Sequence, residues 1–403
     1  MIERPYYLDR LKRLRGTGLA KVLTGMRRAG KSGILRRFGQ QMLEAGAGPD
    51  SVLFVNLELI ENAPLRNAQQ LLAHIRAAAQ RSPDRHLLVM LDEAQEVPGI
   101  GQVAYALLEE GCYDLYLSGS HAHLVEQELA DVMAGRYVEI CVYPLSFAEY
   151  HAAHVARGTV RSSSQLFQQY LEHGGLPYTI MLEQDEYALR DYLDGVYHTV
   201  LRKDVAAGMG HEDPLLLDAL TRQLMASLGQ PVSANGLAKS LAAAGRSCSD
   251  DTVGTYMGAL SNAYAFYRMR RFDLRTKAPL KTQEKVYVGD LGLRTLMLGA
   301  QGASLAGLLE NVVYLELRRR YQEVYQGKHY ARHIGFVAQS AGERAYFQVA
   351  PSVLDPATLQ RTLEPLRAER DNYPKTILTL DEVGLGSHEG ILQRNLVEWL
   401  LEA

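Results

Sequence analysis

The chain has 403 residues, of which 47% are hydrophobic, and its formal net charge is −3 at pH 7. This length allows about two to four domains with their own cores, and the charge excludes a uniformly basic surface for nucleic acid. No signal peptide, bilayer-length apolar run, metal-ligand spacing or disulfide framework is evident, so we expect a cytoplasmic protein without membrane contact and with reduced, buried cysteines at Cys112, Cys141 and Cys248.

The first motif is a phosphate-binding loop at residues 25–32, which read Gly-Met-Arg-Arg-Ala-Gly-Lys-Ser. It follows a β-prone run at 20–24 and precedes an amphipathic helix, the order that the G-x-x-x-x-G-K-[ST] motif requires. Lys31 is expected to reach the β and γ phosphates of ATP, and Ser32 to bind Mg²⁺. Glycines and the helix N-terminus turn backbone amides toward the polyphosphate. The residues expected to hold ATP are Gly25, Met26, Arg27, Arg28, Ala29, Gly30, Lys31, Ser32 and Gly33.

A second motif, at residues 86–93, is an apolar strand that ends in two carboxylates. Uninterrupted apolar runs are typical of parallel strands buried on both faces. Asp92 fits the acid that holds Mg²⁺, and Glu93 is placed to orient and activate a water molecule at the γ-phosphate. The pair predicts hydrolysis of ATP rather than binding alone.

Strands and helices alternate up to residue 147. Strands are predicted at 20–24, 51–56, 86–92, 114–120 and 137–142, with helices at 67–79 and 104–109. This alternation predicts a parallel, doubly wound α/β sheet that binds its ligand beyond the carboxyl ends of the strands. The strand ends at 24–25, 92–93 and 118–120 are therefore expected to converge on one nucleotide.

The middle of the chain reads as a helical region, 148–210, followed by a winged helix-turn-helix, 211–292. Helices are predicted at 147–154, 165–172, 187–205, 215–228, 236–244 and, after a cap that begins at Ser249, a third winged-helix segment to about residue 262. Two β-prone segments, 266–272 and 286–288, would form the wing.

The loop expected between those two segments is basic and is the candidate site for DNA. Its cations outnumber Asp273 and Glu284, which favours contact with phosphates. The third helix has no Lys or Arg from 250 to 262, although base-reading helices usually carry Arg, Lys, Asn or Gln. DNA backbone contact and a purely structural role both stay open. The cations are Arg268, Arg270, Arg271, Arg275, Lys277, Lys281 and Lys285.

The last hundred residues, 300–403, read as a further α/β unit. Helices are predicted at 305–321 and 355–367, strands at 323–325, 333–338, 345–349 and 376–381, and a terminal helix around Trp399.

Further motifs follow in a fixed order along the chain. They are Gly-Arg-Tyr at 135–137, Tyr-Pro-Leu-Ser-Phe at 143–147, Gly-Gly-Leu-Pro at 174–177, Lys-Asp at 203–204, Val-Gly-Asp-Leu-Gly at 288–292, Glu-Asn-Val-Val-Tyr-Leu-Glu-Leu at 310–317, Gln-Val-Ala at 348–350 and Asp-Asn-Tyr-Pro-Lys at 371–375. With the phosphate-binding loop and Leu-Asp-Glu-Ala-Gln at 91–95, the series resembles the prokaryotic AAA-type ATPases close to the archaeal STAND group. That resemblance covers essentially the whole chain and implies a P-loop NTPase core at 1–147.

The resemblance also implies that the C-terminal unit is related to PD-(D/E)XK nucleases. Glu316, or alternatively Glu310, would be the helix acid of such a site, and Gln348 fits the acid or amide position. Gly335 replaces the metal-binding Asp, and Ala350 replaces the Lys that would stabilise phosphate charge. We expect a catalytically degenerate, structural or partner-binding module.

Arg136 resembles the family's Gly-Arg-Tyr arginine, which would sense the γ-phosphate in its own subunit or across an oligomer interface; a structural salt bridge is the alternative. Ser120 or His121 would occupy the polar sensor position, although relatives often carry Asn there. The leading expectation is an ATP-driven switch whose C-terminal domain engages an unidentified protein partner. The alternatives are a DNA-associated ATPase and an ATP-gated, metal-dependent nuclease.

Overall fold

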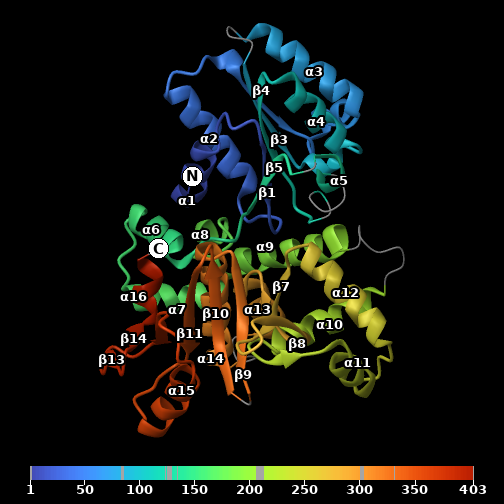
Figure 1. The fold of residues 1–403 in the computed structure, drawn as a ribbon. Helices are drawn as coiled ribbons and strands as arrows, with labels where there is room; N and C mark the ends of the chain where they lie inside the picture. The colour runs from blue at the N-terminus through green and yellow to red at the C-terminus, as the bar shows by residue number, and fades with distance from the viewer. Residues whose placement is uncertain are drawn as a thin grey trace. The chain divides into compact units, whose positions relative to one another are not determined.

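The computed structural model describes residues 2–82, 86–122, 124, 129–133, 135–205, 213–299, 304–330 and 332–402 (Figure 1). The chain divides into two compact units. The first comprises Met1–Pro144 with Asn262–Tyr264, and the second comprises Leu145–Ser261 with Ala265–Ala403.

The first unit is built around a parallel sheet, which within the described residues has five strands in the order β2-β3-β4-β1-β5. The strands are β1 (Ala20–Thr24), β2 (Val52–Asn56), β3 (Leu87–Asp92), β4 (Tyr113–Ser118) and β5 (Tyr137–Cys141). The helices are α1 (Pro5–Arg13), α2 (Lys31–Glu44), α3 (Ala68–Arg81), α4 (Ile100–Glu110) and α5 (Ala130–Met133), with short 3-10 turns η1 (Pro49–Ser51), η2 (Ile60–Arg66) and η3 (Ala94–Glu96). The predicted parallel α/β sheet is confirmed.

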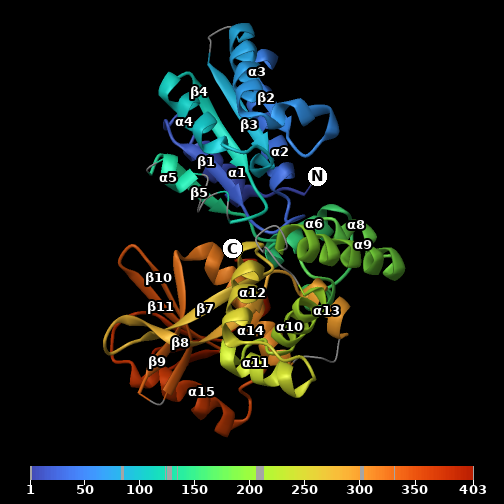
Figure 2. The same cartoon turned by 90° about the vertical axis from the view of Figure 1, so that its right-hand side faces the viewer.

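Helices cover both faces of this sheet, which explains why most side chains of its central strands are apolar. Every residue of β1, β3 and β4 is buried. One core cluster joins the sheet to α3 and α4, and the other joins it to α1 and α2, as Figures 1 and 2 show. Strands buried on two sides are stabilised mainly by apolar side chains on both faces. In β1 and β4 the buried Lys21 and Asp114 form an ion pair with each other.

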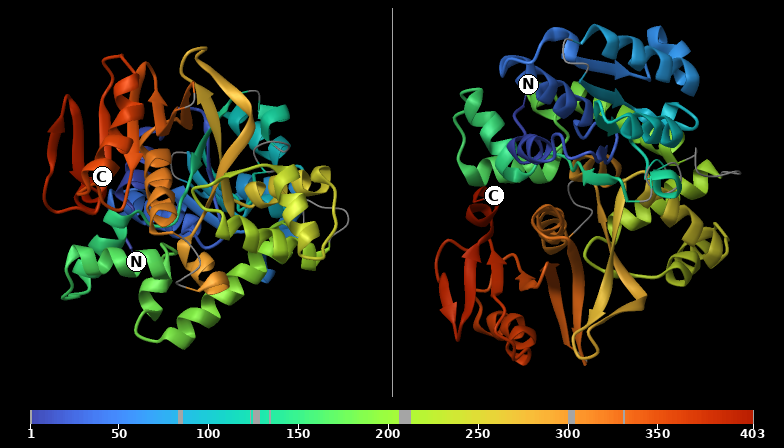
Figure 3. Two further views of the ribbon diagram at one scale, coloured as in Figure 1. Left: turned by 90° about the horizontal axis from the view of Figure 1, so that it is seen from below. Right: turned by 45° about the horizontal axis from the view of Figure 1, so that its top comes forward.

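The second unit combines helices with a mixed sheet (Figure 3). Its helices are α6 (Phe147–Ala156), α7 (Ser163–His173), α8 (Thr179–Leu182), α9 (Glu186–Thr199), the π-helix η5 (Val200–Val205), α10 (Pro214–Ala226), α11 (Ala234–Ala243), α12 (Asp250–Asn262), α13 (Leu291–Leu298), α14 (Leu305–Arg320), α15 (Pro356–Ala368) and α16 (Leu396–Leu401). Its strands are β6 (Pro231–Val232), β7 (Phe266–Asp273), β8 (Ala278–Val288), β9 (Glu323–His329), β10 (Arg332–Ser340), β11 (Glu343–Val349), β12 (Lys375–Thr379), β13 (Gly386–His388) and β14 (Ile391–Asn395).

One sheet runs through the segments predicted as the wing and as the C-terminal unit. Among the residues described, its order is β13-β14-β12-β11-β10-β9-β7-β8-β6. Strand β7 pairs in parallel with β9, in register from Arg271 opposite Gln326 to Asp273 opposite Lys328. The domain boundaries given above stay predictions, but this one sheet contains strands from both sides of residues 292–300.

The prediction of a long basic loop between the two wing segments is wrong. Strand β8 begins at Ala278, not near residue 286, so β7 and β8 form an antiparallel hairpin whose turn covers only 274–277. Charged side chains on strands of a hairpin can face solvent while their neighbours pack inward. Repeated Lys and Arg therefore concealed the strand in the sequence.

Two expectations from composition, on the cysteines and on membrane spans, can be compared with the structure. The three cysteines are free but half-buried rather than buried. Over the part of the chain that the structure describes, no helix is both long and apolar enough to cross a membrane.

Candidate nucleotide-binding site

The phosphate-binding loop joins β1 to α2 through two glycines with positive φ. Gly25 has φ 136°, and a Cβ atom there would lie 2.2 Å from the carbonyl oxygen of Val142. Gly30 has φ 103° and precedes α2, whose N-terminus has no side-chain cap. Only glycine allows these two backbone positions, and the first amides of α2 can then face an anion.

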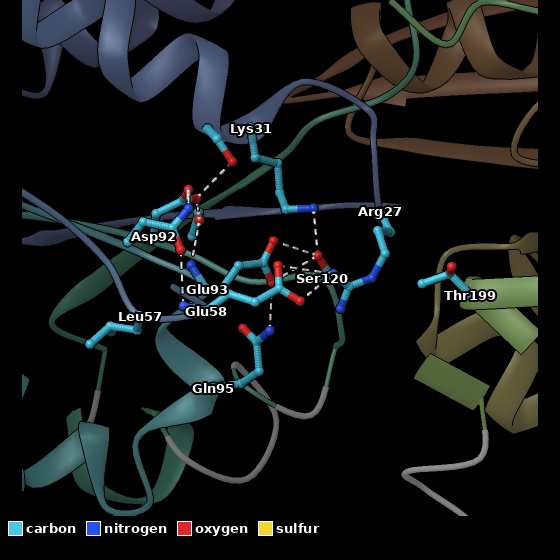
Figure 4. Close-up of polar contacts among 12 residues, drawn as sticks. Arg27, Lys31, Leu57, Glu58, Asp92, Glu93, Gln95, Ser120 and Thr199 are labelled. Carbon is cyan, nitrogen blue, oxygen red and sulfur yellow. Dashed lines mark hydrogen bonds and ion pairs between the residues drawn. The ribbon is translucent and has the colours of Figure 1, made fainter. Parts of the chain in front are cut away.

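Lys31, the first residue of α2, turns back over the loop and is only 3% exposed. Its Nζ donates hydrogen bonds to the carbonyl oxygens of Gly25 (2.8 Å) and Met26 (3.1 Å) and to Ser120 Oγ (3.0 Å), as Figure 4 shows in part. A buried ammonium group therefore lies between the loop and the end of β4.

Asp92 is fully buried at the end of β3 and accepts hydrogen bonds from three side chains. Ser32 Oγ (3.0 Å) and Ser118 Oγ (2.5 Å) donate to Oδ1, and Asn56 Nδ2 (2.9 Å) donates to Oδ2. Burial raises the pKa of the Asp92 carboxyl above its usual value, and the bonds from Ser118 and Ser32 act in the opposite direction. The oxygens of Ser32 and Asp92 are hard donors that suit Mg²⁺, so the residues present fit that ion.

Glu93 lies in the left-handed region, with φ 55° and ψ 51°, and is 7% exposed. Ser120 Oγ donates to its Oε1 and Oε2 atoms (2.9 and 3.0 Å), and Gln95 Nε2 donates to Oε2 (2.6 Å). Left-handed backbone is uncommon for a residue with a side chain and is often found at functional sites. The loop after β1 and the ends of β3 and β4 thus lie together, as their order along the chain led us to expect.

Sequence patterns missed two residues around these side chains, Asn56 and Glu58. Asn56 ends β2 and lies in register with Asp92. Arg27 is nearly buried and forms an ion pair with Glu58 (Nη1–Oε1 3.1 Å). The signal for Asn56 was the end of a predicted strand, but only the strand order shows that β2 neighbours β3.

Arg136 lies away from the phosphate-binding loop. It precedes β5, and Tyr137 pairs with Ala20, the first residue of β1, whereas the loop follows the last residue of β1. Its guanidinium forms an ion pair with Glu109 and lies over the ring of Tyr105 (5.5 Å to the centroid). The prediction that Arg136 contacts the γ-phosphate in its own subunit is therefore wrong, because Arg136 lies at the amino ends of the strands. A role across a subunit interface stays a prediction.

The residues predicted for a nuclease-like site form hydrogen bonds and ion pairs with other residues. Glu316 is 2% exposed and pairs with Arg319 (3.1 Å) and Arg320 (2.7 Å). Gln348 Oε1 accepts a hydrogen bond from the Gly335 amide (2.9 Å), and a Cβ atom at Gly335 would meet that same oxygen. The alternative acid, Glu310, bonds to Lys285 and Tyr287.

The basic residues predicted to contact DNA are dispersed over the β7–β8 hairpin. Arg268 pairs with Glu284 (2.7 Å), and Arg271 is 9% exposed. Arg275, at the hairpin turn, lies over the ring of Tyr330 (4.1 Å to the centroid). Arg270 and Lys277 are exposed, and the side chain of Lys281 lies outside the described part of the structure.

Comparison with known proteins identifies two regions of the chain. An AAA domain matches residues 18–151, and a domain of unknown function (DUF8612) matches residues 164–304. The chain is 33% identical over 402 residues to an uncharacterized protein of Haemophilus influenzae, covering 100% of this chain and 99% of that protein. It is 24% identical over 312 residues to an uncharacterized protein of Methanocaldococcus jannaschii, covering 74% and 66% of the two chains.

Among solved structures, a Walker-type ATPase of Pyrococcus abyssi has a similar fold, with a TM-score of 0.52 and 14% identity. The similarity covers 74% of this chain and 96% of that one. The fold, the match to an AAA domain and the buried lysine of the phosphate-binding loop all indicate a P-loop ATPase core. The chain belongs to the family represented by the Haemophilus influenzae protein and, through its AAA domain, to the AAA-type P-loop ATPases.

Proposed function

We propose that the protein is a magnesium-dependent ATPase that acts as a nucleotide-driven switch. The observation that carries this proposal is the chain of contacts from Lys31 through Ser120 to Glu93, beside the Ser32–Asp92 hydrogen bond. It brings a cation for phosphates, a carboxylate for water activation and two oxygen donors for a metal to one edge of a parallel sheet.

The roles of the individual side chains follow from their chemistry. Ser32 and Asp92 would hold Mg²⁺, which offsets phosphate charge when it is bound. Lys31 would leave the carbonyl oxygens of Gly25 and Met26 to pair with the phosphates of ATP, because its ammonium group is buried against the loop that would hold them. Glu93 would accept a proton from the attacking water, with Ser120 and Gln95 fixing its carboxylate.

We propose that residues 262–264 transmit a conformational change away from the nucleotide-binding site. They belong to the first unit, although the residues on either side of them belong to the second. The Ala122 amide, two residues after Ser120, donates to the Asn262 carbonyl (2.9 Å). Tyr264 OH donates to Glu139 (3.4 Å), which also accepts from Thr24, the last residue of β1. A change at Lys31 and Ser120 can therefore reach Asn262 through short contacts within the first unit.

Asp92→Asn tests the magnesium part of this proposal. Asparagine keeps the size of the side chain and one oxygen acceptor but removes the negative charge that a divalent cation needs. We expect the magnesium concentration for half-maximal ATPase activity to rise about tenfold or more, as for loss of about 1.4 kcal/mol or more of binding free energy. Steady-state phosphate release over a magnesium titration measures it, with Asp9→Asn on exposed α1 as the control. An unchanged magnesium requirement would exclude Asp92 as a ligand.

We propose that the C-terminal part engages a protein partner and does not cut nucleic acid. Gly335 supplies no carboxylate, Ala350 supplies no cation, and Glu316 is already paired with two arginines. Supercoiled plasmid, linear duplex, single strands and RNA should remain intact with Mg²⁺ or Mn²⁺, with and without ATP. Cleavage that co-purifies with the protein, disappears in Glu316→Ala and persists in the exposed control Glu343→Ala would contradict this prediction.

A further inference from the structure

An open cavity of about 620 Å³ lies in the second unit, between residues next to the ends of β9 and β10 and residues of helix α15. Figure 1 labels these three elements. Its volume falls in the usual range for ligand pockets. It is separate from the phosphate-binding loop and from the nuclease-like positions. The described residues that line it are His329, Tyr330, Arg332, Gln360, Arg361, Glu364, Arg367, Ala368 and Arg370.

The lining is strongly basic, since its described residues include four arginines against one glutamate. Arg332 pairs with Glu364 (Nε–Oε1 2.9 Å), and both side chains are close to half exposed or more. Arg367 donates to Gln360 (2.7 Å) and Glu389 (2.9 Å), while its Nε–H is buried without a partner in the described residues. Guanidinium groups present several donors in a planar fork, which suits phosphate oxygens.

Strand β10 carries a histidine close to Arg332 in sequence, with further cations around it. Burial lowers the pKa of His333 on β10 below its usual value, and the charges of Arg271, Lys328 and Lys285 lower it further.

An exposed aromatic ring stands at the edge of the cavity. Tyr330 is 61% exposed and has φ 54°, so the turn holds it in left-handed backbone. The guanidinium of Arg275 lies over its ring, and the His329 ring is stacked beside it (5.1 Å between centroids, 25° between planes). An exposed cation–π contact is weak, so a nucleobase can replace the guanidinium, which then remains close enough to meet a phosphate.

We propose that this pocket binds a nucleotide unit of single-stranded nucleic acid, with the base on Tyr330 and the phosphate on Arg332, Arg367 and Arg370. A duplex would hide the faces of its bases from the tyrosine, whereas single strands offer them. The proposal goes beyond ATP hydrolysis and does not depend on it, because neither the pocket nor its residues belong to the first unit.

The test measures binding of a fluorescent oligothymidine and of a single strand that contains 2-aminopurine, without ATP or magnesium. The protein should bind the single strand more tightly than a duplex of equal length and should quench 2-aminopurine. Tyr330→Ala should weaken binding about five- to one-hundredfold and abolish the quenching, the range expected for loss of one stacked base. Arg370→Ala should weaken binding and reduce the salt dependence by about one phosphate contact.

Two controls match these variants in residue type. Tyr187 is 85% exposed and Arg190 is exposed, both on α9, so Tyr187→Ala and Arg190→Ala should bind like the parent. Thermal unfolding verifies that all variants are folded.

Several outcomes would overturn the proposal. Equal or tighter binding of the duplex, with Tyr330→Ala like the parent, would indicate a general polyanion surface. Loss of binding in Arg268→Ala with Arg270→Ala, but not in the Tyr330 or Arg370 variants, would place the contact on the β7–β8 hairpin. Displacement of the oligonucleotide by thymidine monophosphate at equal concentration of nucleotide units would identify a free nucleotide as the ligand. Absence of binding at low salt would exclude the site.

Discussion

Replacement of Lys31 by alanine should abolish tight binding of ATP. In the structure the ammonium group is buried and donates to two carbonyl oxygens of the loop itself and to Ser120 Oγ. A triphosphate would offer it charged acceptors instead. Two hydrogen bonds to charged groups contribute about 1.5–3 kcal/mol each, which corresponds to roughly 10²- to 10⁴-fold in affinity.

Isothermal titration calorimetry with ATP and Mg²⁺ measures this loss. Lys12→Ala, which removes an exposed lysine on α1 of the same unit, is the matched control and should bind like the parent. Because Lys31 also holds the carbonyl oxygens of Gly25 and Met26, thermal unfolding must show that the variant is folded. Parent-like affinity in a folded Lys31→Ala protein would refute the assignment of the phosphate-binding loop.

The part of the fold that could be predicted most closely is the parallel sheet. Strands β1 and β3 are buried on both faces, so most of their residues are apolar, and the predicted bounds differ from the observed ones by at most one residue. The phosphate-binding loop was equally accessible because its chemistry depends on residues that are adjacent in sequence. In that segment the same adjacent residues determine both the strand–loop–helix structure and the binding of phosphate.

Contacts that depend on strand order could not be predicted. Asn56 forms a hydrogen bond with Asp92 because β2 is the neighbour of β3. The sequence around residue 56 does not determine which strands pair. Similarly, β7 joins β9 in one sheet although some fifty residues of chain separate them in sequence. Pairing of this kind is set by packing of whole elements rather than by the propensity of either strand.

Arg136 shows a different kind of error. The strand at 137–142 was predicted correctly to within one residue, and a residue that precedes a parallel strand lies at its amino end. The prediction of the strand therefore already contradicted a contact between Arg136 and the nucleotide of its own subunit. The Gly-Arg-Tyr motif by itself does not specify at which end of the sheet its arginine lies.

Glu93→Gln should preserve ATP binding and reduce turnover by about 10²- to 10⁴-fold, the usual range for removal of a general base. Glutamine keeps the shape of the side chain but cannot accept a proton from water. The structure also explains why the substitution should be tolerated. Gln95 donates to Glu93 (2.6 Å), and its own Oε1 atom is buried without a partner in the described residues, so rotation of the Gln95 amide would let it accept from the new amide. Ser120 could still donate to the remaining oxygen.

Single-turnover and steady-state ATPase assays, together with nucleotide calorimetry, separate the two parts of this prediction. Glu44→Gln on α2, an exposed glutamate of the same unit, controls for loss of a negative charge and should hydrolyse ATP at the parent rate. A Glu93→Gln protein that binds ATP and turns over slowly would also be the form in which to trap the proposed partner. If it instead hydrolyses ATP as fast as the parent, the base is another group, and the contact of Ser120 with Glu93 would serve only to hold the ends of β3 and β4 together.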